Sequence, residues 1–520
     1  MGKKLSLIVL VLILLLAAFM RLYMISSYMT FLGDEGRDAL VAKGILDGHL
    51  TLLGPRASAG DFFTGPIYYY MMAPFLWLFH LDPVGPAVMV ALFGVATVFL
   101  IYYVGKQWFN EKAGLLAAAM YAVSPLVINY SHSSWNPDTV PFFSLLTLYI
   151  LYKAVTTVRS WKYYVFVGFL LGICIQLHYI SLFLAVTVAI SLLLMHWYLN
   201  GRVKVVPLIK YYLEIFLGFL IGFAPFLAFE LRHNFMNLKA IAAFITADTT
   251  QAGYLQYHAF YQPIADVFFR LFGRLVFALP VPVDYAKFPL IDLQLVGLVI
   301  LIFAFVSIFF LLKDKNKFAV ILVSVWLLVG VLLFGLYKKP IYDYYLVFMF
   351  PLPFLLIGNL LAKVCDFKQN KLRYGIVLSA ILFIGIFGYN LTKNPFLNTP
   401  NKQKDQARSI AQFIISKTDN KQFNFALISS GNSDHEYRYF MEVLGHKPVQ
   451  LDTLPNDPSR KTVTSQLLVA CEDKNCKPLG NPLWEVAGFG NAVIAGQWNY
   501  SIVTVYRLVH PDDKPTSTTR

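Results

Sequence analysis

The sequence has little charge for its length and almost no cysteine. Charged side chains make up 14% of the 520 residues and hydrophobic ones 58%, and the mean hydropathy is +0.59. A soluble multidomain protein is excluded, because soluble domains carry about 25% charged residues. The four cysteines lack the spacing of a zinc finger. The composition therefore predicts a membrane protein.

Acidic residues are scarcer than basic ones, with 29 Asp and Glu against 43 Lys and Arg. Most of the basic residues lie in short loops between apolar runs, where they indicate membrane orientation and not nucleic-acid binding. Residues 1–4 and the apolar run 5–20 resemble a signal peptide, but no small-residue cleavage site follows them. We therefore expect an uncleaved first span and no nucleic-acid partner.

Apolar runs of about 20 residues are long enough to cross a bilayer. About eleven are present, at 5–25, 84–105, 113–130, 139–156, 163–178, 179–197, 211–229, 291–312, 318–336, 342–362 and 374–391. The run 65–81 is short and rich in tyrosine, which is typical of a membrane interface. If it does not cross, the basic loops lie on the cytoplasmic side with the N-terminus, as the positive-inside rule requires.

This topology predicts a multi-pass protein of the cell membrane with three parts. Residues 1–391 form a transmembrane domain whose two long external loops are 26–83 and 230–290. Residues 392–510 form a small extracytoplasmic α/β domain, with strands at 423–429 and 501–508 and a helix at 434–444. Residues 511–520 are a disordered tail. Cys471 and Cys476 lie in the oxidising compartment, so we expect a disulfide between them.

The stretch 31–38 places four ionisable side chains directly after the first span. Carboxylates at a membrane boundary are costly without a function, so Asp34 and Glu35 are the candidate catalytic acids. A structural role is the alternative: Asp34 would cap a helix from Glu35 to Leu46, which Gly48 would end. The two roles do not exclude each other.

Five motifs occur in a recognisable order along residues 1–390. They are Gly33-Asp34-Glu35, the segment 65–70 (Gly-Pro-Ile-Tyr-Tyr-Tyr), the loop 105–109 (Gly-Lys-Gln-Trp-Phe), the loop 134–138 (Ser-Trp-Asn-Pro-Asp), and the segment from Tyr344-Tyr345 to Pro351. Their order resembles the GT-C membrane glycosyltransferases of family 39, the superfamily of dolichyl-phosphate-mannose–protein mannosyltransferases and lipid A aminoarabinose transferases.

The resemblance implies a polytopic α-helical GT-C fold with interfacial helices in the first external loop. It also implies a sugar donor linked to polyprenyl phosphate, and an acid of the first external loop that acts as base on the acceptor. Asp34 matches that acid. Where relatives often have Glu-Lys-Pro-Pro or His-Pro-Pro, this chain has Thr64-Gly-Pro-Ile67. A metal is therefore not carried over, although Asp61, Arg56 or Lys43 could replace the missing charges.

Other polar residues have both a functional and a structural interpretation. Asp138 is a candidate second acid, with Asp61, or a cap for the span that begins at Thr139. His178 is a candidate ligand of the donor phosphate, with Arg56, or a histidine hydrogen-bonded between helices. Lys338 and Lys339 suit a phosphate leaving group by charge, or they contact anionic headgroups. Arg232, Arg270 and Arg274 could close over a donor, but solvated surface positions are the commoner explanation.

The sequence thus favours an inverting glycosyltransferase that moves a sugar from a polyprenyl-phosphate donor to a protein, lipid or glycan on the external face. The alternatives are a polytopic transporter or lipid-linked sugar flippase, and a non-catalytic scaffold. Carriers place ionisable residues at mid-membrane depth, whereas these acids cluster just outside the first span. No cofactor is required by this hypothesis. The need for a divalent cation stays open, with Asp34 or Asp138 as its ligand if one binds.

Overall fold

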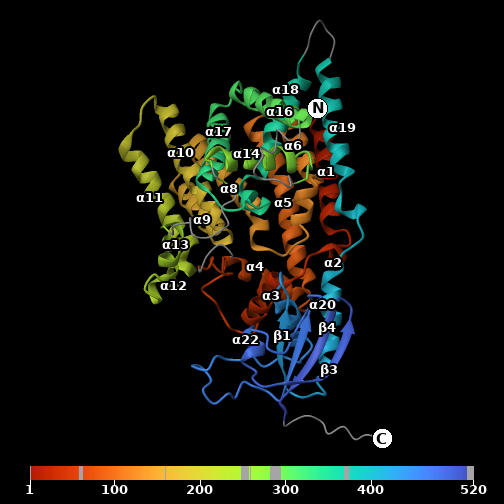
Figure 1. Ribbon diagram of the computed structural model, residues 1–520. Helices are drawn as coiled ribbons and strands as arrows, with labels where there is room; N and C mark the ends of the chain where they lie inside the picture. The colour runs from red at the N-terminus through yellow and green to blue at the C-terminus, as the bar shows by residue number, and fades with distance from the viewer. Residues whose placement is uncertain are drawn as a thin grey trace. The chain divides into compact units, whose positions relative to one another are not determined.

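The computed structural model describes residues 2–57, 62–158, 160–246, 257, 259–280, 294–367 and 374–511 (Figure 1). The chain divides into two compact units. The helical unit contains Met1–Tyr23, Leu50–Met71 and Ala87–Thr399. The sheet unit contains Met24–His49, Met72–Pro86 and Pro400–Arg520. Segments of the first predicted external loop thus belong to the same compact unit as the C-terminal sheet.

The helical unit consists mainly of apolar helices. In chain order these are α1 (Lys3–Leu22), α5 (Val84–Trp108), α6 (Glu111–Val123), α7 (Pro125–Tyr130), η1 (Asn136–Thr139), α8 (Val140–Lys153), η2 (Ala154–Val158), α9 (Trp161–Leu177), η3 (Tyr179–Ser181), α10 (Leu182–Asn200), α11 (Val205–Gly222), α12 (Ala224–Arg232), α13 (Met236–Thr246), α14 (Tyr261–Phe269), η5 (Arg270–Arg274), α16 (Gln294–Leu312), α17 (Lys317–Leu332), η6 (Leu333–Leu336), η7 (Asp343–Met349), α18 (Pro351–Cys365), α19 (Tyr374–Leu391) and η8 (Pro395–Leu397).

Seven helices among the described residues are long and apolar enough to cross a membrane, and an eighth span results if the bent pair η7 and α18 counts as one. The prediction of a polytopic helical protein is thereby confirmed, while the number of eleven spans stays a prediction. Helix α4 (Ile67–Leu78) has only 12 residues. At 1.5 Å per residue it measures about 18 Å, well below the hydrocarbon thickness.

Glycine residues allow the backbones of neighbouring helices in the helical unit to pack closely. A Cβ atom on Gly168 of α9 would lie 1.8 Å from the carbonyl oxygen of Ile215 on α11, so only glycine lets these two helices pack this closely. At the end of α6, the buried guanidinium of Arg21 donates to the carbonyl oxygens of Tyr121 and Ala122. It thereby satisfies carbonyl groups that a helix C-terminus leaves without intrahelical partners.

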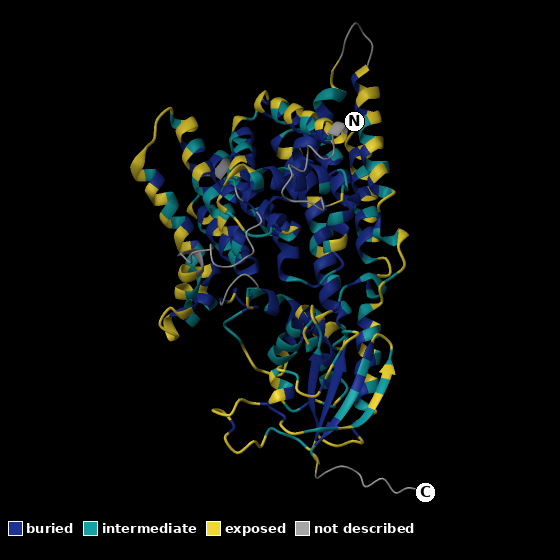
Figure 2. Ribbon diagram, in the orientation of Figure 1, coloured by how far each residue is buried: buried dark blue, intermediate teal, exposed yellow. Residues whose placement is uncertain are grey.

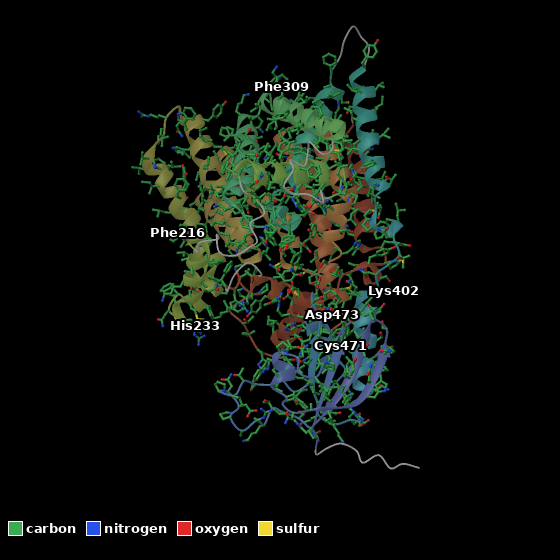
Figure 3. All side chains as sticks on the ribbon, viewed as in Figure 1. Phe216, His233, Phe309, Lys402, Cys471 and Asp473 are labelled. Carbon is green, nitrogen blue, oxygen red and sulfur yellow. A yellow bond between two sulfur atoms is a disulfide. The ribbon has the colours of Figure 1, made fainter. Side chains whose placement is uncertain are left out.

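Apolar side chains also cover the outside of the helical unit. Phe216 of α11 and Phe309 of α16 are both more than half exposed (Figure 3). Figure 2 shows the same pattern for whole helices, since α11 and α19 carry many exposed positions although their sequences are apolar. Large exposed apolar faces are the expected surface of helices whose solvent is lipid.

The sheet unit contains four strands and several helices. They are α2 (Ile25–Tyr28), α3 (Gly33–Leu46), α20 (Gln403–Ile415), β1 (Asn424–Ile428), α21 (His435–Val443), β2 (Gln466–Cys471), α22 (Trp484–Ala487), β3 (Val493–Tyr500) and β4 (Val503–Val509). The strand order is β1-β2-β4-β3, with β1 and β2 parallel and the other pairs antiparallel. All six residues of β2 are buried, as expected for a central strand. The predicted strands and helix correspond to β1, β4 and α21.

Two segments of the first predicted external loop pack against the C-terminal part of the sheet unit. The ring of Phe31 meets those of Tyr439 and Phe440 on α21. The Tyr439 hydroxyl donates to the carbonyl oxygen of Leu81, and Lys404 on α20 forms an ion pair with Asp82. Helix α3 itself packs along α21.

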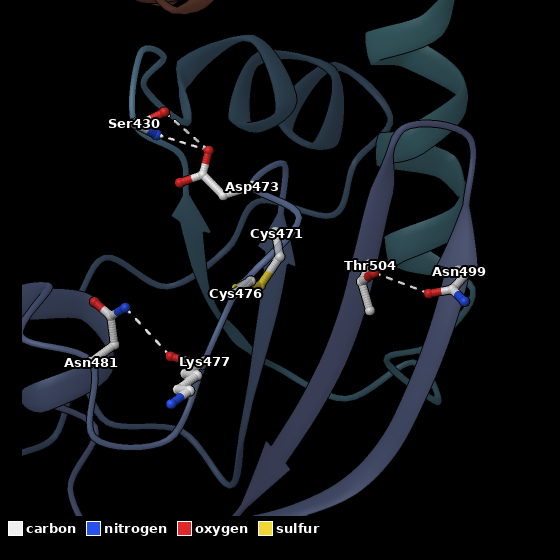
Figure 4. The surroundings of a disulfide bond; sticks show 8 residues. All are labelled: Ser430, Cys471, Asp473, Cys476, Lys477, Asn481, Asn499 and Thr504. Atoms are coloured by element: carbon white, nitrogen blue, oxygen red, sulfur yellow. Dashed lines mark hydrogen bonds between the residues drawn. A yellow bond between two sulfur atoms is a disulfide. The ribbon is translucent and has the colours of Figure 1, made fainter.

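The predicted disulfide is present. Cys471, the last residue of β2, is bonded to Cys476 (Figure 4). In the same loop, the Asp473 carboxylate accepts hydrogen bonds from the backbone nitrogen and the hydroxyl of Ser430. The bond closes a tight loop at the end of β2, and Asp473 ties that loop to the end of β1.

Candidate active site

Asp34 lies in the first turn of α3, directly after the N-terminal residue Gly33. The N-cap position belongs to Leu32, so the alternative in which Asp34 caps the helix is wrong. One Asp34 carboxylate oxygen accepts a hydrogen bond from Nη1 of Arg37 at 2.8 Å, and 57% of the side chain is exposed. Asp34 therefore presents a carboxylate that a hydroxyl group in solution can reach.

Glu35 supports the loop instead. Its Oε1 accepts from the Thr30 hydroxyl at 2.7 Å, and its Oε2 accepts from the backbone nitrogen of Leu32 at 3.1 Å. The side chain is buried. This is the glutamate half of a capping box, in which a carboxylate satisfies a donor that a helix start leaves without a partner. Both oxygens of Glu35 thus hold the chain that leads into α3.

Arg37 links Asp34 to a buried acid. Its Nε and Nη2 atoms donate to Oδ1 of Asp38 at 2.9 and 2.8 Å, and Nη1 reaches Asp34. Asp38 is fully buried, so this ion pair fixes the guanidinium, and a guanidinium fork that is held rigidly orients the carboxylates it binds. At the other end of the helix, Lys43 forms ion pairs with Asp47 and Glu442, and the hydrogen bond to Asp47 raises the pKa of Lys43.

The first turn of α3 lies against residues 432–436 in the C-terminal part of the sheet unit. The backbone nitrogen of Gly33 donates to Oδ1 of Asn432 at 3.1 Å. A Cβ atom on Gly36 would lie 2.3 Å from the backbone nitrogen of Glu436, so the close approach requires glycine. Sequence reasoning missed Asn432 and Glu436, and the glycine at position 36, within a helix, was the available signal of a close approach.

A cluster of buried charges lies in the helical unit. Arg270 donates to Asp266 at 2.8 Å and to Asp343 at 2.7 Å, and Arg274 also binds Asp343. The interpretation of Arg270 as a solvated surface residue is wrong, because its side chain is only 3% exposed. Two arginines and two aspartates balance each other in charge. The cluster therefore anchors η7, which begins at Asp343, to η5 and α14.

The remaining candidates of the helical unit differ in accessibility. Lys338 is exposed, and Lys339 beside it is partly exposed. His178 is buried, with its ring against those of Tyr179, Tyr344 and Tyr345. Its Nδ1 has no hydrogen-bond partner among the described residues, so both its role as a phosphate ligand and its role as a hydrogen-bonded structural histidine stay predictions. Lys338 is therefore an exposed cation of this segment.

Asp138 and Arg56 also belong to the helical unit. Asp138 lies in η1, and the N-cap of α8 is Thr139, so the capping role expected for Asp138 is wrong. Arg56 is exposed and pairs through its backbone with Phe63. Asp61 lies outside the described residues. Within the described ranges, no three His, Cys, Asp or Glu side chains form a group able to hold a metal ion.

Comparison with known proteins agrees with this architecture. Residues 64–229 match the model of the dolichyl-phosphate-mannose-protein mannosyltransferase family. The structure is similar to that of ArnT from Cupriavidus metallidurans bound to undecaprenyl phosphate, with a TM-score of 0.60, 13% identity, and coverage of 97% of this chain and 98% of that one.

A second similar structure is the archaeal oligosaccharyltransferase AglB from Archaeoglobus fulgidus, in complex with an inhibitory peptide and a dolichol-phosphate. Here the TM-score is 0.55 at 14% identity, and the match covers 90% of this chain and 69% of that one. No curated protein matches the sequence. The chain has the GT-C fold of membrane glycosyltransferases, as its motifs predicted.

Proposed function

We propose that the protein is an inverting glycosyltransferase that moves one sugar from a polyprenyl-phosphate donor to an acceptor on the external face of the membrane. The observation that carries the proposal is the exposed Asp34 carboxylate, held by Arg37 at the start of α3 in a chain with the GT-C fold. ArnT binds undecaprenyl phosphate and AglB a dolichol-phosphate, which supports a lipid phosphate as the donor here.

Asp34 is the general base of the proposed reaction. An acceptor hydroxyl attacks the anomeric carbon while the bond from that carbon to the phosphate oxygen breaks. Asp34 takes the hydroxyl proton as the new bond forms, and the electron pair of the broken bond leaves on the lipid phosphate. Arg37 holds the carboxylate in place, and the buried Asp38 holds Arg37.

Lys338 and Lys339 are the proposed contacts of the leaving phosphate. They precede Asp343, which forms ion pairs with Arg270 and Arg274. Cations fixed near the departing phosphate stabilise the charge that develops there. The arginines already neutralise Asp266 and Asp343, so the exposed charge of Lys338 is better suited to a ligand.

The test compares Asp34→Asn with Asp47→Asn in membranes incubated with a panel of radiolabelled polyprenyl-phosphate sugars. Asp47 is a matched control, because it lies at the other end of α3, is 51% exposed, and also binds a basic neighbour. Removal of a general base costs about 10²-fold or more in turnover. We expect this loss for Asp34→Asn at a normal level of inserted protein, and near-normal transfer for Asp47→Asn.

Three other outcomes would contradict the proposal. Normal transfer by Asp34→Asn together with loss in Glu35→Gln or Asp138→Asn would move the base to another acid. Normal transfer by all three variants would refute the carboxylate mechanism. Movement of the labelled lipid across the membrane without sugar transfer would favour the flippase hypothesis.

A further inference from the structure

Asn432 makes hydrogen bonds to both parts of the sheet unit that meet beside Asp34. Its Oδ1 accepts from the backbone nitrogen of Gly33 at 3.1 Å and from that of Ser433 at 3.0 Å.

The amide nitrogen of Asn432 faces two acids. Nδ2 donates to the carboxyl group of Glu436 and to both oxygens of Glu472, the latter at 3.3 and 3.4 Å. We call Asn432, Glu436, Glu472 and Tyr437 the Asn432 network, because the Tyr437 hydroxyl completes it by donating to Glu472 at 2.6 Å.

These partners determine the orientation of the amide. Two backbone donors lie on one side of Asn432 and two carboxyl groups on the other, so only the carbonyl oxygen can face Gly33. Glu436 is 1% exposed, and burial raises its pKa to about 8, with repulsion from Glu472 and Asp434 adding to the effect. At neutral pH Glu436 is therefore mostly protonated, and its carboxyl group faces the amide nitrogen of Asn432.

The contact with Gly33 occurs one residue before the proposed base. The first amide nitrogens of a helix lack intrahelical partners, and a side-chain oxygen that accepts from one of them fixes the first turn. In α3 the nitrogen of Gly33 is bonded to a residue 399 positions away in the sequence. Glu35 fixes the chain before the helix and Asn432 fixes the turn that carries Asp34.

We propose that Asn432 is a positioning residue for the transfer reaction, through which the C-terminal domain sets the place of Asp34. The proposal rests on the proposed function, because it assumes that Asp34 acts on the acceptor. Asn432 acts through the backbone of Gly33 and needs no contact with the reacting atoms. The C-terminal domain is then a part of the catalytic apparatus.

The effect should be specific to turnover. A displacement of about 1 Å in a catalytic group can reduce the rate about 10²-fold. We expect Asn432→Ala to lower kcat about 10-fold to 10²-fold, while KM for the donor lipid changes less than about threefold. Hydrogen exchange at the amides of residues 33–38 should become faster. Asn499→Ala is the control, because Asn499 bonds Thr504 within the β3–β4 hairpin of the same unit.

A pair of variants tests the direction of the hydrogen bonds. Asn432→Asp preserves the acceptor for Gly33 but replaces the amide donor that faces Glu436 and Glu472 with a carboxylate, so kcat should fall at least as far as in Asn432→Ala. Adding Glu436→Gln supplies an amide donor to that carboxylate. The double variant Asn432→Asp with Glu436→Gln should recover kcat to within about fivefold of the wild-type value. Both substitutions nearly preserve side-chain volume, so this pair decides the question even if Asn432→Ala does not accumulate.

The assay uses the labelled polyprenyl-phosphate sugar of the panel that the wild-type protein transfers, with the full chain in detergent. Two results, each with Asp34→Asn inactive, would overturn the positioning role. One is a wild-type kcat in Asn432→Ala, and the other is an equal kcat in Asn432→Asp and the double variant. The positioning role would also be overturned if kcat fell while hydrogen exchange at the amides of residues 33–38 stayed unchanged. Full activity of Asp34→Asn would instead contradict the proposed function, which separates the two failures.

Discussion

The Glu436→Gln substitution should stabilise the protein at pH 8 and change its stability little near pH 4.5. Burial raises the pKa of Glu436 from 4.5 to about 8, and Glu472 and Asp434 add repulsion. Each pKa unit corresponds to about 1.4 kcal/mol, so the shift corresponds to an upper bound of about 5 kcal/mol. Relaxation of the site would reduce this value, and an effect of about 2 to 3 kcal/mol is expected.

The sign follows from proton linkage. Between pH 4.5 and pH 8 the unfolded chain has released the Glu436 proton while the folded protein still binds it, so stability falls as the pH rises through this window. Above about pH 8 both states are ionised and the penalty is constant. A glutamine does not titrate, so the difference between variant and wild type should be small at pH 4.5, grow up to about pH 8 and stay constant above it.

The variant preserves the packing of the protonated acid. Oε2 of Glu436 has no hydrogen-bond partner among the described residues, so a protonated glutamic acid and a glutamine leave a similar donor at that place. Melting temperatures of the purified protein at pH 5 and pH 8 measure the effect, with Glu485→Gln of α22 as a control in the same unit. An equal shift at both pH values, or destabilisation at pH 8, would refute the reasoning.

Two further predictions concern the supports of the site and of the sheet. Glu35→Gln weakens the hydrogen bonds to Thr30 and Leu32, so it should cost about 1 kcal/mol of stability, as measured by thermal melts. In the transfer assay it should lower kcat much less than Asp34→Asn does. Replacing Cys471 and Cys476 together by serine opens a loop with only four residues between its ends, which should cost about 2 kcal/mol or less and leave transfer intact; complete loss of folded protein would contradict this.

The sequence was informative where the signal is local. Apolar runs predicted the helices, β-branched and aromatic segments predicted β1 and β4, and the predicted external location of Cys471 and Cys476 predicted their bond. The polar stretch 31–38 predicted the position of Asp34 and the helix that follows it. The separate roles of Asp34 and Glu35 could not be predicted from it. Whether Asp34 or Glu35 holds the helix start depends on which side chain turns back to Leu32, and that is a matter of side-chain geometry.

The contacts that were missed join residues that are distant in the chain. Nothing in the segment around Asn432 indicates that its amide meets a backbone nitrogen 399 residues away. The same is true of Arg270, whose partner Asp343 is 73 residues further along. A charged residue in an external loop looks solvated when only its neighbours in sequence are known. Burial and pairing are tertiary properties, so they appear only when the helices are assembled.

Helix α3 depends on these distant contacts for its own stability. It has 14 residues, three of them glycines at positions 33, 36 and 44, and each glycine costs a helix about 1 kcal/mol relative to alanine. An isolated helix of this length is marginal in water even with good helix formers. The first turn must therefore be stabilised from outside, and packing against α21 together with the bond to Asn432 provides this support.

Two glycine substitutions distinguish the low helix propensity of glycine from its role in the close contact between α3 and residues 432–436. A Cβ on Gly44 would meet only the Cβ of His49 at 3.9 Å, so Gly44→Ala should stabilise the protein by about 1 kcal/mol and leave transfer unchanged. Gly36→Ala makes the same gain in helix propensity but drives its methyl group into the backbone of Glu436, so it should destabilise the protein and lower kcat. Thermal melts and transfer assays of the two variants measure the difference. If both alanines stabilised the protein and neither reduced transfer, the first turn of α3 would not need its contact with residues 432–436.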